Sequence, residues 1–189
     1  KNPIIMGWGS NWSYAGDIPS EGRRGMFSMP RKLSLIKESG QFSLVQKPIY
    51  SSRIHVEKLI LKASELTKPK TLEMKNNTYK LSLAIDLENS NGFAMDLLKN
   101  KEEKCVLTYH AKTQKLFFDR TKSGKVDFNK NFSSIESMQV APQNGVLKLD
   151  IFVDNSIVEV FADEGKAVLT DLVFPKKNGG KIILSLLKD

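Results

Sequence analysis

Aromatic side chains gather near the start of the chain, where Trp8, Trp12 and Tyr14 lie in one short segment. The polar residues of the same segment are Ser10, Asn11 and Asp17. Tryptophan and tyrosine rings offer flat apolar faces together with a hydrogen-bonding group. Because sugar rings present apolar C–H faces surrounded by hydroxyls, this mixture suits stacking on a sugar. Tryptophans in short segments also serve often as core residues, so the structural alternative stays open.

Carboxylates are the second group that could do chemistry, because glycoside hydrolysis uses two carboxyl groups about 5 to 9 Å apart. Asp17 and Glu21 lie in the tryptophan-bearing segment, and Glu159 lies in 157–161 out of phase with its apolar neighbours. We interpret Asp17 as a turn residue and Glu21 as a solvated acid. We expect Glu159 to face away from the main core as a surface or paired carboxylate. No catalytic residue is therefore assigned within the chain.

The sequence gives little support for a metal site, a redox site or a cofactor site. His55 and His110 are the only histidines, and neither has a partner at ligand spacing. Cys105 is the only cysteine, which excludes an intrachain disulfide, and its flanks Val106 and Leu107 predict a buried thiol. No glycine-rich loop joins a strand to a helix in the manner of a phosphate site. We expect no metal and no cofactor.

The formal net charge of +8 could attract nucleic acid, an anionic polysaccharide or an acidic membrane. The lysines are, however, scattered, and a run such as 99–104 mixes both signs, which is typical of a solvated face. No basic stripe carries interleaved aromatics, and no apolar run approaches the roughly 20 residues of a membrane span. We expect neither nucleic acid nor membrane as a partner.

The elements that position these residues are predicted to be strands. From about residue 31 the apolar positions alternate with period two, most clearly from Tyr79 to Leu87, where every second residue is apolar. Similar runs occur at 32–36, 42–46, 54–61, 93–98, 105–110, 115–119, 146–153, 156–162, 167–174 and 181–187, separated by turn-forming residues. Residues 62–68 could form one helical turn. Many short strands at regular spacing predict an all-β sandwich or barrel.

Residues 1–30 differ from the rest, since they contain both tryptophans and show little alternation. We place a boundary at Pro30–Arg31, which divides the chain into a first segment, 1–30, and a β domain, 31–189.

Three stretches in order along the chain resemble glycoside hydrolase family 32, the invertases, levanases, inulinases and related β-fructosidases. The segment from Trp8 to Leu33 resembles the end of that family's five-bladed β-propeller. Asp119–Gly124 and 149–161 are similar to motifs of its C-terminal β-sandwich. The resemblance implies an all-β chain in which an antiparallel β-sandwich follows a remnant of the last propeller blade.

The resemblance also implies what the chain lacks. The family's nucleophile and transition-state stabiliser lie in propeller motifs that contain Asp-Pro, and its acid/base lies in a propeller motif that contains Glu-Cys. Neither dipeptide occurs here. Whether the chain counts as an enzyme is therefore uncertain, since the parent would be a β-fructosidase but this part is expected to be inactive alone.

What carries over is a set of substrate-binding candidates bordering the family's fructose pocket: Trp8, Asn11, Trp12 and Tyr14. Arg24 and Arg31 are expected to tie the blade to the sandwich through backbone carbonyls. Implied partners are fructan or sucrose, the upstream propeller and a second copy in a homo-oligomer. The family favours an extracellular or periplasmic location, although the compartment, the fructan type and exo or endo action are not fixed by the sequence. The alternative function is a stand-alone, non-catalytic carbohydrate-binding module.

Overall fold

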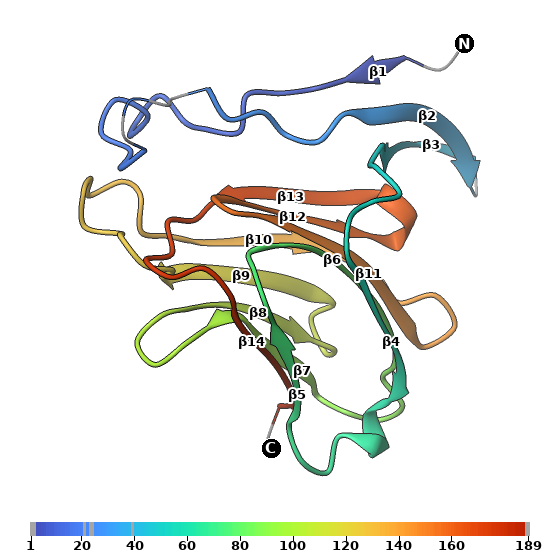
Figure 1. The fold of residues 1–189 in the computed structure, drawn as a ribbon. Helices are drawn as coiled ribbons and strands as arrows, with labels where there is room; N and C mark the ends of the chain where they lie inside the picture. The colour runs from blue at the N-terminus through green and yellow to red at the C-terminus, as the bar shows by residue number, and fades with distance from the viewer. Residues whose placement is uncertain (1–2, 21, 23–24, 39, 188–189) are drawn as a thin grey trace.

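The computed structural model describes residues 3–20, 22, 25–38 and 40–187 of the 189-residue chain and is built from strands in three sheets (Figure 1). Strands are β1 (Ile4–Ile5), β2 (Arg31–Glu38), β3 (Gln41–Pro48), β4 (Val56–Lys62), β5 (Lys70–Met74), β6 (Thr78–Asp86), β7 (Gly92–Lys99), β8 (Lys104–His110), β9 (Lys115–Lys122), β10 (Ile135–Gln139), β11 (Val146–Asp154), β12 (Ile157–Ala162), β13 (Ala167–Leu172) and β14 (Gly180–Leu186). Two 3₁₀ turns, η1 (Ala63–Glu65) and η2 (Asp163–Gly165), complete the described elements. Among these residues no helix has the length and hydropathy of a membrane span.

Two sheets form the sandwich. One has the strand order β10-β9-β8-β7-β14-β5 and the other β13-β12-β11-β6-β4. Their inner faces hold the main core, as the alternation predicts: every second residue from Tyr79 in β6 to Leu87, directly after its end, is at most 4% exposed. Leu83 lies directly opposite Leu149 of β11 in the strand register. Phe93 and Met95 of β7, in the opposite sheet, belong to the same buried cluster. The two sheets therefore pack face to face, and the all-β sandwich prediction is confirmed.

One pairing is parallel. Strand β6 pairs antiparallel with β11 on one side and parallel with β4 on the other. The chain leaves β4 through η1, adds β5 to the opposite sheet and then returns as β6. Parallel neighbours require such a crossover. The helical turn predicted at 62–68 is the short η1.

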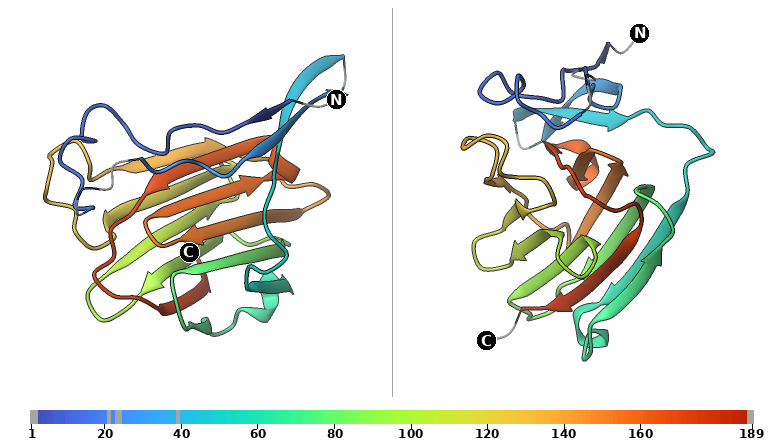
Figure 2. Two further views of the ribbon diagram at one scale, coloured as in Figure 1. Left: turned by 45° about the horizontal axis from the view of Figure 1, so that its top comes forward. Right: turned by 60° about the vertical axis from the view of Figure 1, so that its left-hand side comes forward.

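The third sheet is small and has the order β1-β2-β3. It lies beside β12 and β13, on the far side of the five-stranded sheet from the C-terminus (Figure 2). The β2–β3 hairpin approaches η2 closely, because a Cβ at Gly165 would lie 2.3 Å from the Gln46 carbonyl oxygen. Strand pairing therefore groups residues 31–48 with β1 in one sheet. The chain passes from this small sheet into the sandwich after Pro48. The boundary at residues 30 and 31 stays a prediction about folding units.

A second apolar cluster joins the N-terminal loop, residues 6–20, to the sandwich. Tyr14 and Ile18 of the loop pack with Phe132, Leu172 and Phe174, all of them at most 6% exposed. The rings of Tyr14 and Phe132 meet edge to face with centroids 5.2 Å apart. This packing anchors the segment that carries the tryptophans.

Candidate functional site

The N-terminal loop is shaped by its own backbone hydrogen bonds. Gly9 N donates to Met26 O at 2.8 Å, and Trp8 forms an isolated antiparallel bridge with Phe27. The next residues turn tightly, since Ala15 N donates to Asn11 O at 2.9 Å. The Asn11 side chain supports the turn by accepting a hydrogen bond from Ser13 N at 2.8 Å. The loop thereby brings two tryptophans that are four positions apart into contact.

Trp8 and Trp12 stand side by side at the surface. Their ring centroids are 4.7 Å apart and the planes are inclined by 58°. Trp8 is 37% exposed and Trp12 88% exposed, and Asn11 is exposed as well. These three candidates therefore share one surface, where an aromatic face is open to a ligand. Their role in substrate binding stays a prediction.

Tyr14 points the other way. Its side chain is 6% exposed within the second apolar cluster, and its hydroxyl accepts a hydrogen bond from Arg120 Nη1 at 3.4 Å. The Arg120 guanidinium also lies over the Tyr14 ring, 5.4 Å from the centroid. The structure thus separates Tyr14 from the exposed tryptophan pair.

A crevice of about 390 Å³ opens beside Trp8. Its walls are residues 8–11 of the loop, 136–138 of β10 and 168–171 of β13, together with Tyr14 and Arg120. Arg120 and Asp171 form a buried ion pair inside it, with Nη1 3.2 Å from Oδ1. Burial raises the pKa of the Asp171 carboxyl from 3.8 to about 6, with a smaller contribution from Glu136, while Arg120 opposes the rise.

Sequence reasoning missed the crevice residues Arg120 and Asp171, although a signal was present. Arg120 falls in phase with Leu116 and Phe118 of β9, and Asp171 falls in phase with Leu169 of β13. A charged residue at an inward-facing position needs a partner of opposite charge. Two such positions of opposite sign indicate a buried pair.

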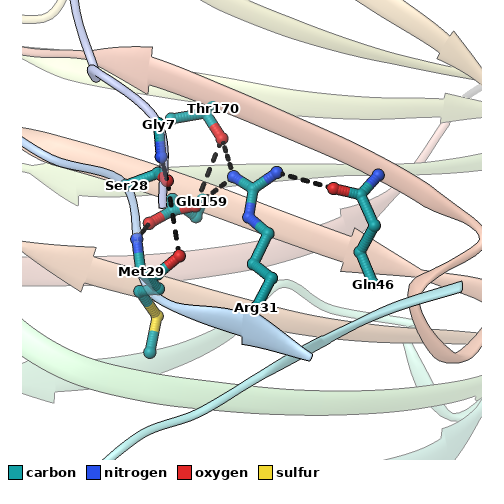
Figure 3. Close-up of polar contacts among 7 residues, drawn as sticks. All are labelled: Gly7, Ser28, Met29, Arg31, Gln46, Glu159 and Thr170. Carbon is teal, nitrogen blue, oxygen red and sulfur yellow. Dashed lines mark hydrogen bonds and ion pairs between the residues drawn. The ribbon is translucent and has the colours of Figure 1, made fainter. Parts of the chain in front are cut away.

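A second polar cluster joins the small sheet to the sandwich (Figure 3). Arg31 at the start of β2 places Nη2 2.5 Å from Glu159 Oε2 of β12 and 2.5 Å from Thr170 Oγ1 of β13. Its Nη1 donates to Gln46 Oε1 at 3.1 Å, and Glu159 Oε1 accepts from Met29 N. Glu159 is 1% exposed. Of the two roles expected for it, a surface carboxylate or a paired one, the structure shows the paired one.

Arg31 accordingly ties the small sheet to the sandwich. The prediction that it does so through backbone carbonyls is wrong. A carboxylate, a hydroxyl and a side-chain amide take their place, because they are the groups that β3, β12 and β13 direct toward the guanidinium. Arg24 lies outside the described residues.

The described residues of the N-terminal loop itself contribute no pair of acids to a pocket. Asp17 is exposed and accepts a hydrogen bond from Asn129 Nδ2 at 2.6 Å, while Glu21 lies outside the described residues. Over the same part of the chain no group of three or more His, Cys, Asp or Glu side chains could hold a metal ion. Cys105 is buried, as its apolar flanks predict.

Comparison with known proteins decides the family. The sequence model described as "Glycosyl hydrolases family 32 C terminal" matches residues 44–185. The chain belongs to glycoside hydrolase family 32. It is 32% identical to an extracellular exo-inulinase of Aspergillus awamori over 185 residues, which cover 93% of this chain and 34% of the relative. A levanase of Bacillus sp. strain L7 is 29% identical over 91% of this chain and 19% of its own length.

Solved structures agree with this family 32 assignment. The exo-inulinase of Aspergillus awamori superposes with a TM-score of 0.81 at 28% identity, over 98% of this chain and 37% of that one. A fructofuranosidase of Schwanniomyces occidentalis, at a TM-score of 0.80 and 18% identity, shows the same fold. This family 32 chain spans 19% to 42% of the length of these relatives.

Proposed function

We propose that this chain is the C-terminal part of a family 32 β-fructosidase acting on levan, inulin or sucrose, and that its sandwich supports an upstream β-propeller. The observation that carries the proposal is the superposition on exo-inulinase over 98% of the chain, which includes the small sheet and the N-terminal loop. A sandwich module alone would leave those residues unmatched. The sequence predicts that the remnant of the last propeller blade ends at Pro30. The pairing of β1 with β2 and of β2 with β3 favours extending that remnant to Pro48.

The small sheet has an apolar surface that supports this assignment. Leu35 and Leu44 lie directly opposite each other in the β2–β3 register and are 67% and 45% exposed. Phe42, on the same side of β3 as Leu44, is 69% exposed, whereas Val45 on the opposite side is 4% exposed. Clustered apolar side chains of this kind mark an interaction surface. In the proposed parent they pack against upstream propeller strands.

Catalysis in the proposed parent comes from upstream carboxylates. The chain contains neither of the family dipeptides Asp-Pro and Glu-Cys, and Asp17 is a surface residue held by Asn129. The chain alone is then inactive, and its contribution is to complete the last blade and to hold that blade against the sandwich through Arg31 and Glu159.

The test is complementation. The segment encoded upstream of Lys1 is expressed separately and mixed with this chain, and release of fructose from levan, inulin and sucrose is measured. The proposal expects activity in the mixture and none from the chain alone. Leu35→Lys should abolish the gain, whereas Ile135→Lys, a matched change of an exposed residue on β10, should leave it intact. Association without any hydrolysis, or no association, would contradict the proposal.

One observation favours the stand-alone carbohydrate-binding module as a second candidate. The exposed Trp8–Trp12 pair is a ready stacking surface within this chain. The module predicts that the chain alone pulls down with insoluble levan and that Trp12→Ala releases it. Retention of the chain only in the presence of the upstream segment would rule the module out.

A further inference from the structure

A cavity of about 550 Å³ lies where the segment after β3 crosses the outer face of the five-stranded sheet. Strands β4, β6 and β11 form its floor, and the end of β3, Tyr50 and η2 complete its walls. The volume lies within the roughly 300 to 1,000 Å³ of small-molecule pockets. Its lining includes none of the exposed apolar residues Leu35, Phe42 and Leu44 of the small sheet, so the cavity is separate from that surface.

The floor of the cavity is apolar and open to solvent. Ile60 of β4 lies beside Ala84 of β6 in the parallel register, and Ile60 is 71% exposed. The short side chain of Ala84 leaves room above the sheet between its longer neighbours. An exposed sheet face of this kind gives a ligand a flat apolar surface, which suits a planar body.

The Tyr50 wall is held in place by a polar network. Its hydroxyl accepts a hydrogen bond from Lys80 Nζ at 2.9 Å, and its ring lies against Phe152 with centroids 5.1 Å apart. Lys80 Nζ is also 3.0 Å from Asp150 Oδ2, while Asp150 Oδ1 accepts from Ser82 Oγ at 2.6 Å. Lys80 therefore neutralises the Asp150 carboxylate. The Tyr50 ring, 43% exposed, is a fixed aromatic surface at the cavity.

Three lysines determine the sign of the charge around the cavity. Lys47, Lys58 and Lys148 line it and are exposed, and none of their ammonium groups has a hydrogen bond or ion pair to a described residue. Besides the neutralised Asp150, the lining contains one carboxylate, that of the exposed Glu164. The excess of positive charge favours an anion. Because the lysines are at the surface, an anion can reach them without breaking an internal contact.

The positions of two of these lysines indicate where the anion lies. Lys58 belongs to β4 and Lys148 to β11, the strands on either side of β6. Lys148 is directly opposite Ala84, and Lys58 is beside Ser82, two positions earlier on β6. A charged group above β6 is therefore flanked by an ammonium group from each neighbouring strand.

We propose that this cavity binds a planar aromatic molecule that carries one carboxylate. The aromatic body lies on Ile60 and Ala84 beside the Tyr50 ring, and the carboxylate pairs with Lys58 and Lys148. Fructans and sucrose are neutral, so the proposed function of the chain makes no use of these ammonium groups. The site is complete within this chain and is tested without the upstream segment.

The probes share one aromatic body and differ in charge. 2-Naphthoate is anionic, 2-naphthamide is neutral and 2-naphthylmethylammonium is cationic, while acetate supplies a carboxylate without a ring. Isothermal titration calorimetry on the native chain measures affinity, and NMR shifts of backbone amides locate the site. We expect saturable binding of 2-naphthoate, about fivefold tighter than that of 2-naphthamide, from two surface ion pairs. The cationic probe should bind more weakly than both, and acetate should not saturate. The largest amide shifts should fall in 58–60, 82–84 and 148–150.

Substitutions separate the charge from the apolar floor. The double variant Lys58→Met/Lys148→Met should lower the affinity for 2-naphthoate about fivefold and leave that for 2-naphthamide unchanged. Lys112→Met/Lys115→Met, a matched change of two exposed lysines outside the cavity, should alter neither affinity. Ile60→Ser should weaken both probes alike, by about threefold. Thermal unfolding checks that each variant is folded, and the exposed lysine pair decides the outcome if Ile60→Ser is not.

Any of four results would overturn the inference. They are no saturable binding of 2-naphthoate, equal affinity for 2-naphthoate and 2-naphthamide, amide shifts centred outside the cavity, and displacement of 2-naphthoate by fructose. The last of these would make the cavity a sugar site.

Discussion

Arg31 and Glu159 form an ion pair at 2.5 Å between two different sheets, with side chains only 12% and 1% exposed. Arg31 begins β2 of the small sheet, and Glu159 lies in the middle of β12 of the sandwich. The Arg31 guanidinium also lies 5.2 Å from the centre of the Phe161 ring. A single buried cation thus connects the two parts of the fold that the proposed function requires to act together.

Replacing Arg31 with Met should destabilise the chain by about 3–5 kcal/mol, because it leaves the Glu159 carboxylate buried without its cation. Urea unfolding measures the loss. Lys181→Met is the matched control, since the Lys181–Glu73 pair is 49% and 70% exposed and such surface pairs contribute about 0–1 kcal/mol. The double variant Arg31→Met/Glu159→Leu should recover part of the loss. Equal effects of Arg31→Met and Lys181→Met would refute a buried role for the pair.

Limited proteolysis should show whether the N-terminal segment is docked. The native chain should resist cleavage in residues 3–20, 25–38 and 40–48, because Tyr14, Ile18 and Arg31 fix these stretches to the sandwich. Glu159→Gln should expose it and yield a product that begins near residue 49, identified by mass spectrometry. Rapid trimming of the native chain to about Arg31 would mean that the segment is loose.

Stability should depend on pH through Asp171. Its folded-state pKa of about 6 lies above the ordinary 3.8, so between these values the folded state binds more protons than the unfolded state. The Asp171 carboxyl therefore favours folding at low pH. Its contribution to the free energy of unfolding falls by roughly 3 kcal/mol in total as pH rises through about 6. In urea unfolding from pH 4 to 7, the native chain should lose stability relative to Asp171→Asn. A difference that stays constant or runs in the opposite direction would count against this account.

Gly124 should be intolerant of a side chain. It has φ +118°, and a Cβ there would lie 2.1 Å from Phe174 O, which accepts a hydrogen bond from Lys125 N at 2.9 Å. Gly124→Ala should cost about 3 kcal/mol from strain and overlap. Gly16→Ala, where the added Cβ meets nothing within 4 Å, should change the free energy of unfolding by no more than about 0.5 kcal/mol.

Much of the fold was predictable from the sequence because alternation and turn residues are local signals. β6 is the clearest case, since all five residues predicted to share a face are buried. β5 and β10 were missed because they are edge strands with few apolar residues, Leu72 and Met74 in β5 and Ile135 and Met138 in β10. The parallel pairing of β4 could not be predicted, because it depends on a crossover through the opposite sheet.

The candidate site was predictable only in part. Trp8 and Trp12 stand out by residue type and spacing, and their contact follows from one turn at Asn11. Tyr14 belongs to the same motif but faces inward, which residue type alone does not reveal. The Arg120–Asp171 pair joins strands of different sheets, so their distance depends on how the sheets close.

In the proposed parent, the exposed face of β2 and β3 receives upstream strands of a family 32 propeller. Hydrogen exchange of the chain, alone and mixed with its upstream segment, tests this most directly. We predict slower exchange across Arg31–Pro48 in the mixture, with no change in the sandwich strands β7 and β8. Unchanged exchange in β2 and β3, despite a folded upstream segment in excess, would contradict the claim.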